Sequence, residues 1–531
     1  MNRILSFYNK YELWIFVIIS LLCASHVFTF YVFPTLDGPH HLYNANMILG
    51  ILEGNPLVQD YYKFNTLPIS NLIGHGSLAF FNLFLPSAMA LNLMIFLYMM
   101  GMAFSFRYMM IAISGRFSPL NYSIFPFMLN GSLTLGLFNY CLSIILLFIL
   151  IGYWIKVHKT LTTKQLLIAG LLLTLMVFSH LLSFVFFGLT IIVLLFYEMF
   201  YGIIKEKKIH YKSLLVKILK ITLITIPPAI LLVIYFMSIS DFLGKVTRVV
   251  NDDMSLFGNL YYIRPLVIYH GGHDGNANIP LFFGLLALTV LSGIFWYRNG
   301  KNDKKTAFNS SFMLTMTLFF LLLLIVVPPG FFLHTMRIRL SLFFFFFLIM
   351  WMGSIRLTGW IELLGALFFL FIFTEHQLRI GPVRSHHAIN AKDLHSLEKL
   401  MEPNSVFLPV NAGTFWGDEF ILNYIGSDKP MINLKNPQAY GPFPVMWNYG
   451  KMPYTTFGGF DRSEIEIFYM SGPKTNKERE IDYVIIHHPE NLEIKRANGE
   501  FTNFYRILDS KFEFVAKSPR ERTSLYKRIG K

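Results

Sequence analysis

The chain has 531 residues, of which 54% are hydrophobic and 14% are charged, whereas an ordinary soluble domain carries roughly 25% charged residues. This composition excludes a soluble globular protein and indicates many apolar segments of about 20 residues, each able to cross roughly 30 Å of hydrocarbon. The net charge of +14 is accompanied by no nucleic-acid-binding signature, so no nucleic-acid partner is expected. Both cysteines, Cys23 and Cys141, lie in apolar runs, which excludes a disulfide framework.

Apolar runs separated by polar breaks predict a polytopic α-helical membrane protein with about eleven transmembrane helices. The predicted spans are 12–33, 68–85, 88–113, 136–155, 165–179, 182–201, 214–236, 280–297, 308–327, 340–355 and 358–375. The segment Ser118–Leu135 is also apolar, but its prolines and its Asn130-Gly131 pair interrupt the helical pattern. We expect a re-entrant piece rather than a full crossing, because irregular backbone at membrane depth must be buried in protein.

The distribution of charge divides the chain into two predicted domains. Residues 1–375 form the transmembrane domain, with long outer loops at 34–67 and 237–279. Residues 376–531 hold 21 of the 45 basic and 18 of the 31 acidic residues, which is the chemistry of a soluble domain. Strand-like stretches at 405–410, 430–434, 481–487, 512–517 and 523–528 alternate with helix-like stretches at 390–401, 416–425 and 501–509. This alternation predicts an α/β domain with a largely parallel sheet.

The positions of lysine and arginine indicate the orientation. Loops 156–164, 205–220 and 298–305 are rich in both and fall on the same side of the predicted spans as the N-terminus. Cytoplasmic loops carry such an excess. We therefore expect a bacterial-type inner (plasma) membrane protein with its N-terminus in the cytoplasm and its C-terminal domain outside.

The first outer loop opens with the sequence LDGPHHLYN at residues 36–44, directly after the first span. A proline near the start and apolar residues at helical spacing predict a short amphipathic helix. Asp37 precedes this helix and has two interpretations. It is either an N-cap or a general base, held just above the hydrocarbon, that takes a proton from an acceptor hydroxyl.

Other polar side chains fall in the outer loops or at the outer ends of spans, and they are the candidates for substrate binding. They are His40, His41, Tyr43, His75, Asn139, Tyr140, His180, Arg264, His334, Arg337 and Arg339. Arg337 and Arg339 favour a bidentate site for phosphate oxygens, although arginine at a membrane end also snorkels. The histidines and tyrosines either line a common polar cavity or anchor the chain at the interface.

The second outer loop contains a weaker candidate, a metal site. His270, His273 and Asp274 have a spacing compatible with a divalent metal, but no second pair of ligands stands nearby.

The sequence resembles the GT-C superfamily of integral-membrane glycosyltransferases. The resemblance rests on an acidic residue at the end of the first span, a surface helix in the first outer loop, about a dozen spans and an outer C-terminal domain. It covers the layout of residues 1–375, and its sharpest residue match is Asp37. The resemblance implies that this acid is a catalytic base or a metal ligand and that the donor is a polyprenyl-phosphate-linked sugar.

Two departures from that family pattern bear on mechanism. Asp37 is followed by Gly38 and Pro39 instead of a second acid, which favours a metal-independent reaction over one with Mg²⁺ or Mn²⁺. The tail lacks the W-W-D-like motif of oligosaccharyltransferases and has only the weakly similar Trp416-Gly417-Asp418. Transfer of a glycan to protein asparagine is therefore not expected.

The leading hypothesis is a membrane hexosyl- or pentosyltransferase. It would move a sugar from the polyprenyl-phosphate donor to a hydroxyl of a cell-envelope glycan, lipid or protein, with Asp37 as the base. The alternatives are a lipid or glycan transporter or flippase, and a non-catalytic envelope-assembly protein of the same architecture. Scarce charge in mid-membrane and no evident inverted repeat speak against a transporter.

Overall fold

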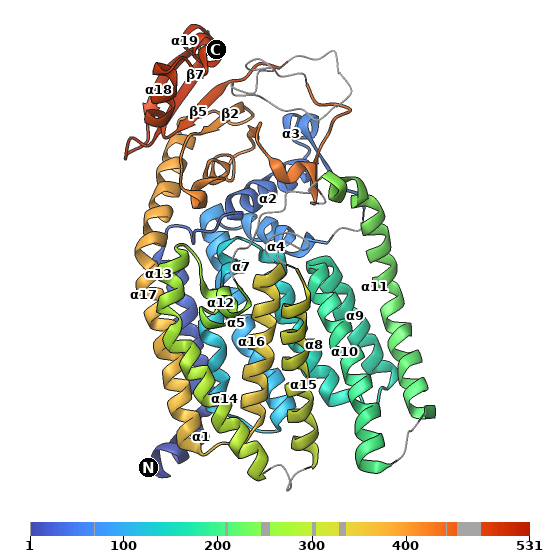
Figure 1. Ribbon diagram of the computed structural model, residues 1–531. Coiled ribbons are helices and arrows are strands. Elements are labelled where there is room, and N and C mark those ends of the chain that lie inside the picture. The colour runs from blue at the N-terminus through green and yellow to red at the C-terminus, as the bar shows by residue number, and fades with distance from the viewer. Residues whose placement is uncertain are drawn as a thin grey trace. The chain divides into compact units, whose positions relative to one another are not determined.

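The computed structural model describes residues 2–67, 70–207, 211–245, 255–299, 304–328, 336–441, 443–453 and 479–530. Within these ranges, nine helices are long and apolar enough to cross a membrane. The chain is therefore a polytopic helical membrane protein (Figure 1).

Contacts divide the chain into two compact units. The membrane unit comprises Met1–His26 and Phe96–Gly381, and the loop–tail unit comprises Val27–Ile95 and Pro382–Lys531. The second boundary lies close to the predicted one at residue 375, but the first outer loop joins the C-terminal region instead of the transmembrane domain. Residues far apart in the sequence thus build one unit.

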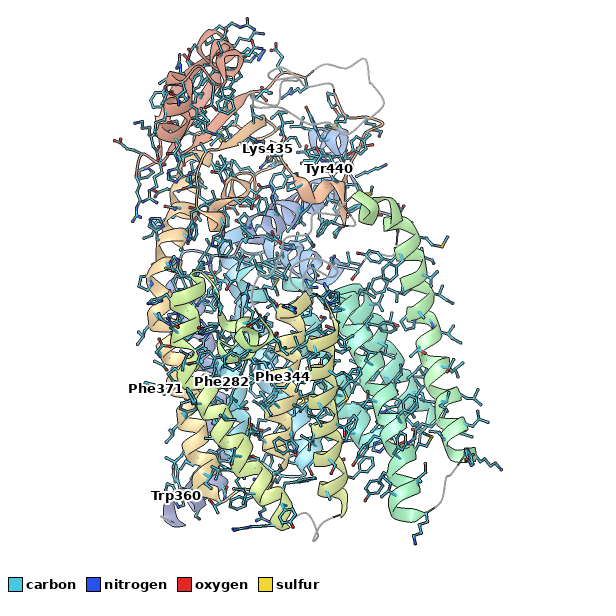
Figure 2. The ribbon with its side chains drawn as sticks, viewed as in Figure 1. Phe282, Phe344, Trp360, Phe371, Lys435 and Tyr440 are labelled. Atoms are coloured by element: carbon cyan, nitrogen blue, oxygen red, sulfur yellow. The ribbon has the colours of Figure 1, made fainter. Side chains whose placement is uncertain are left out.

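Five of the nine candidate spans lie in single helices: α5 (Ser87–Ser114), α8 (Phe138–Val157), α15 (Lys304–Val326), α16 (Met336–Ser354) and α17 (Gly359–Glu398). A sixth, Leu214–Met237, lies within the longer helix α11 (Tyr211–Lys245). The other three each combine two adjoining elements: α1 with η1 over Ser6–Thr29, α10 (Leu181–Tyr201) with the start of η3 (Gly202–Glu206), and α13 (Gly271–Ala277) with α14 (Ile279–Asn299). Here α1 is Asn2–Ser25 and η1 is His26–Thr29. Apolar side chains such as Phe371 project outward from α17 (Figure 2) and suit a lipid environment.

The predicted span 68–85 is wrong. The corresponding helix α4 is Leu72–Asn82, and its 11 residues extend over only about 16 Å, too short to cross hydrocarbon. The predicted span 165–179 forms α9 (Thr163–Ser179), a shorter apolar helix of 17 residues.

The segment predicted to be re-entrant instead runs along the full length of α16. It forms three short pieces, η2 (Pro119–Ile124), α6 (Phe125–Met128) and α7 (Gly131–Thr134). Its contacts with α16 progress from one helix end to the other. Near the C-terminal end of α16, the Cβ of Leu120 lies 3.9 Å from the position that a Cβ on Gly353 would occupy. In the middle, the ring centroids of Phe127 and Phe345 are 5.8 Å apart. Near the N-terminal end, the Arg339 guanidinium lies 4.7 Å from the ring of Tyr140, which follows the segment.

This path makes the segment a broken crossing, and the re-entrant prediction is wrong. All of residues 118–134 are buried, which satisfies the requirement that irregular backbone in a membrane be surrounded by protein.

Three ion pairs neutralise acidic residues of the membrane unit. Glu12 binds Arg107 at 2.6 Å and Glu198 binds Lys217 at 2.6 Å. Glu362 pairs with Arg116 and also accepts a hydrogen bond from the backbone of Leu357. Paired in this way, these acids are structural.

The C-terminal part of the loop–tail unit is an α/β domain. Its strands are β2 (Val406–Asn411), β3 (Ile432–Asn433), β5 (Tyr483–His487), β6 (Phe512–Lys517) and β7 (Thr523–Arg528), in the order β3-β2-β5-β7-β6. Helices α18 (Pro489–Ala497) and α19 (Thr502–Lys511) precede β6. Strand β2 pairs in parallel with β3 and β5, whereas β7 pairs antiparallel with β5 and β6. The sheet is therefore mixed rather than largely parallel.

Helix α2 (Gly38–Leu52), of the first outer loop, packs against this domain. The hydroxyl of Tyr43 donates to the carbonyl of Met431 (2.9 Å) and accepts from the backbone N–H of Asn433 (2.8 Å). A two-stranded sheet of β1 (Tyr62–Phe64) and β4 (Val445–Trp447) adds a second link. Helix α3 (Pro56–Tyr61) leads into β1. These contacts hold the start of α2 at a fixed position on the tail.

Gly426 is required where the tail meets α2. Its φ is +83°, and an added Cβ would lie 3.0 Å from the Tyr43 ring, whereas Gly499, with φ +82°, has open space around it. We expect Gly499→Ala to lower the free energy of unfolding by roughly 1 kcal/mol and Gly426→Ala by roughly 1 kcal/mol more. Thermal unfolding of the two purified variants in detergent measures the difference, and equal effects would contradict the close packing.

Candidate functional site

Asp37 immediately precedes α2, yet its side chain does not cap the helix. The helix begins at Gly38 with Pro39 in its first turn, and the Asp37 carboxylate makes no hydrogen bond to the helix N-terminus. Among the residues that the structure describes, the carboxylate has neither a hydrogen bond nor an ion pair. The capping interpretation is therefore wrong, and only the functional interpretation of Asp37 remains as a prediction.

The surroundings of Asp37 favour its protonated form. The residue is partly buried, and burial together with the negative charge of Glu419 raises the pKa of its carboxyl to about 7. Burial destabilises the charged form, and a nearby like charge adds to this effect. A carboxylate with a pKa near neutrality is well matched to general base catalysis.

His40 lies on the first turn of α2 and is 1% exposed. Its Nε2 is buried and has no hydrogen-bond partner within the described part of the chain. Burial, with a contribution from His75, lowers the pKa of His40 to about 3, so the ring is neutral at physiological pH. The ring packs against Phe420 with the centroids 4.2 Å apart.

His41 and His75 form a buried pair. His75, on α4, donates from Nδ1 to the carbonyl of Asn71 (3.0 Å). Its Nε2 lies 2.8 Å from Nδ1 of His41 and 3.2 Å from Oε1 of Gln438, and burial lowers the pKa of His75. The pair ties α2 to α4 and fixes the orientation of the first turn.

A cavity of about 560 Å³ lies in the loop–tail unit. Its lining residues are Pro409, Asn411, Gly413, Thr414, Phe415, Trp416, Glu419, Phe420, Leu422, Asn423, Leu434, Lys435, Asn436, Pro437 and Tyr440. Lys435 and Tyr440, which are labelled in Figure 2, both belong to this lining. Two lining residues also interact with the start of α2, since Glu419 acts on Asp37 and Phe420 packs on His40. Aromatic faces among amide and charged groups are suited to a sugar.

A second cluster of predicted residues forms within the membrane unit. The guanidinium of Arg339 lies 4.7 Å from the centre of the Tyr140 ring, which packs edge-on against His180 at 5.2 Å. Arg339 is 7% exposed and has no carboxylate partner among the described residues. Asn139 adjoins this cluster and its carbonyl accepts a hydrogen bond from Ser179 (2.8 Å). These predicted residues therefore lie together within this unit, and their role in substrate binding stays a prediction.

The remaining predicted substrate-binding residues have different outcomes. Tyr43 is fully buried, and its hydroxyl is hydrogen-bonded to the backbone of Met431 and Asn433. The prediction that Tyr43 contacts the substrate directly is therefore wrong. Arg264 is partly buried and donates to the carbonyl of Val267 (3.3 Å). Arg337 is partly buried at the start of α16, and His334 lies outside the described residues.

The metal site predicted in the second outer loop is wrong. One carboxylate oxygen of Asp274 accepts from the backbone N–H groups of Ile268, Tyr269 and His270, and the other pairs with Arg379. His273 is largely exposed, with its ring nitrogen 3.9 Å from that carboxylate. Asp274 therefore closes the turn before α13 instead of binding an ion. Asp37, too, belongs to neither of the two possible metal-ligand clusters found within the described ranges.

Two lining residues that interact with the start of α2, Glu419 and Phe420, were not predicted from the sequence. Both residues belong to the sequence WGDEF at 416–420, but nothing in that sequence indicates a contact with residues 36–44. That link is a tertiary contact between segments separated by more than half the chain.

No family model matches the chain, and no curated protein matches it significantly.

Proposed function

We propose that the protein is a membrane glycosyltransferase that moves a sugar from a polyprenyl-phosphate donor to a hydroxyl of a cell-envelope acceptor. The observation that supports this most strongly is Asp37, a partly buried carboxylate without a partner among the described residues and with a pKa near 7. Structural carboxylates are normally hydrogen-bonded or paired. A carboxylate without a partner in the described part of the chain, influenced by the charge of the cavity residue Glu419, fits a group that acts on a ligand.

In the proposed reaction, the Asp37 carboxylate takes the proton of the acceptor hydroxyl. The oxygen then attacks the anomeric carbon of the donor sugar, and the bond from that carbon to the phosphate oxygen breaks. The acceptor's sugar face would rest on Phe415, Trp416 and Tyr440 in the cavity. The neutral His40 would hold a hydroxyl through its Nε2, which has no partner among the residues that the structure describes.

The departing phosphate needs a cation because its negative charge grows as the bond breaks. Within the membrane unit, Arg339 offers a buried guanidinium with no acid to neutralise it among the described residues. We propose that Arg339 binds the phosphate of a lipid substrate within the membrane unit. The basic loops of the chain support a cytoplasmic N-terminus and an outer active site.

The pH dependence of sugar transfer tests the role of Asp37. The reaction needs the ionised carboxylate, so we expect kcat/KM to fall about tenfold for each pH unit below 7 and to level off above it. Burial lowers the pKa of the neighbouring His40 to about 3, so that ring is already neutral over this range. The assay measures transfer from a radiolabelled polyprenyl-phosphate sugar in proteoliposomes.

Two results would contradict the proposal. One is a rate that does not change between pH 5.5 and pH 8. The other is movement of the lipid-linked sugar across sealed vesicles without a covalent product, which would favour the transporter alternative.

A further inference from the structure

A cluster of histidine and aspartate side chains lies at the end of β5 in the loop–tail unit. His487 is the last residue of β5, His488 follows it, and Asp418 ends the short helix η5 (Trp416–Asp418). We propose that Asp418, His487 and His488 bind one divalent transition-metal ion of the zinc class. This proposal concerns a different set of residues from Asp37 and does not depend on the proposed transferase activity.

The potential ligand atoms of these three residues all lie within 4.8 Å of one another. Bonds of about 2.0–2.1 Å in a tetrahedral site place ligand atoms about 3.4 Å apart, so small side-chain rotations bring the three to coordinating distance. Neighbouring residues on a strand normally point to opposite faces. The left-handed conformation of His488, with φ +57°, instead brings its ring to 4.4 Å from that of His487.

In both histidines, a hydrogen bond to a neighbouring side chain fixes one ring nitrogen and leaves the other available to a metal ion. Nδ1 of His487 is bonded to Oγ1 of Thr523 (2.8 Å), and Nδ1 of His488 to Oε1 of Glu490 (2.6 Å). Metal-binding histidines are typically fixed through the second ring nitrogen in this manner. In the proposed site, the Nε2 atom of each ring would bind the metal.

One of these Nε2 atoms is buried and unsatisfied. His487 is 1% exposed, and its Nε2 has no hydrogen-bond partner among the described residues. A buried polar atom without a partner is costly. A metal ion bound to this nitrogen would supply the missing interaction.

The donor set indicates which ion fits. Two imidazoles and one carboxylate suit zinc and its transition-metal neighbours, whereas magnesium and calcium select sets made mostly of oxygen atoms. Asp418 is 3% exposed and one of its oxygens lies 2.8 Å from Nδ1 of His387, which orients the carboxylate. Three protein ligands leave a fourth position for water or another ligand.

The other possible cluster, His395, Glu398 and Asp428, is a poorer site. Nδ1 of His395 is bonded to the Tyr31 hydroxyl (2.8 Å), and its Nε2 lies 3.1 Å from the carbonyl of Tyr424. Both ring nitrogens are therefore occupied by protein groups. The contrast with His487 favours the first cluster.

An ion at Asp418, His487 and His488 would hold one wall of the cavity. Asp418 is next to the lining residue Glu419, and a Cβ on the lining residue Gly413 would lie 3.0 Å from the His488 ring. The metal would thus connect the central strand of the sheet with the loop that carries Trp416 and Phe420. Its expected role is to order that loop.

Zinc binding by the full-length protein in detergent tests the site. The protein is treated with EDTA, reloaded with ZnSO₄ and desalted, and zinc is counted by mass spectrometry. We expect one zinc ion per chain, with loss of retained zinc in His487→Ala and His488→Ala. Thr523→Val removes only the group that orients His487 and is expected to weaken zinc affinity roughly 10- to 100-fold, as measured by competition with a chelating dye.

His273→Ala is the matched control, because it removes an exposed histidine outside the cluster. It should retain zinc like the unaltered protein. His488 is partly exposed, so its variant serves if His487→Ala fails to fold. A reloaded protein without zinc, or unchanged zinc binding by His488→Ala and Thr523→Val, would overturn the proposal.

Discussion

An Asp37→Asn protein should transfer sugar roughly 10²- to 10⁴-fold more slowly than the unaltered protein, the range expected when a general base is removed. Asparagine has nearly the same shape as aspartate but cannot accept the proton of the acceptor hydroxyl. Initial rates with a polyprenyl-phosphate sugar in proteoliposomes measure the loss. The residual rate should also lose its dependence on pH near 7, because the titrating carboxyl is gone.

The same substitution should stabilise the fold at alkaline pH. The pKa of Asp37 rises from 3.8 to about 7 on folding, so between these values the folded state holds a proton that the unfolded state has released. Stability then falls as the pH rises from about 4 to about 7, and above pH 7 the full cost of a buried charge is present. Removing the charge should raise the free energy of unfolding by roughly 1 kcal/mol or more at pH 8.

Thermal unfolding in detergent at pH 5 and pH 8 measures this effect. The apparent Tm of Asp37→Asn should exceed that of the unaltered protein at pH 8 and approach it at pH 5. Glu53→Gln, at the exposed other end of α2, is the control and should change neither the rate nor the Tm. If Asp37→Asn destabilises the protein, Asp37 has a structural role and the base assignment fails.

Local patterns in the sequence were enough to predict many elements. Strands at 405–410, 481–487, 512–517 and 523–528 and a helix at 501–509 correspond closely to β2, β5, β6, β7 and α19. Alternation of apolar and polar residues and breaks at glycine and proline are local signals. Asp37 was found in the same way, from its position between a span and a proline-started helix.

Contacts between distant segments left no such signal. The antiparallel pairing of β7 with β5 and the packing of α2 on the tail depend on contacts between distant residues, such as the Tyr43 hydroxyl with Met431. The cavity beside Asp37 could not be predicted for this reason. The same holds for the broken crossing at 118–135, since only its contacts along α16 show that it traverses the membrane unit.

The second large effect is expected at Arg339. This arginine is buried against Tyr140 and has no acid partner among the described residues, so its charge is a cost to the free protein. Arg339→Met keeps a long apolar side chain and removes the charge. We expect sugar transfer to fall roughly 10²- to 10³-fold, the effect of losing one group that stabilises developing negative charge, while the apparent Tm rises.

Arg107→Met is the matched control because Arg107, also in the membrane unit, does have an acid partner, Glu12, at 2.6 Å. Breaking that pair leaves a buried carboxylate alone and should lower the free energy of unfolding by about 3 kcal/mol or more. A higher Tm in Arg339→Met and a lower Tm in Arg107→Met would show that Arg107 stabilises the fold whereas Arg339 does not, as expected for an arginine that binds a ligand. If Arg339→Met instead destabilises the protein and leaves transfer unchanged, Arg339 belongs to the second class, and the donor phosphate must be bound elsewhere.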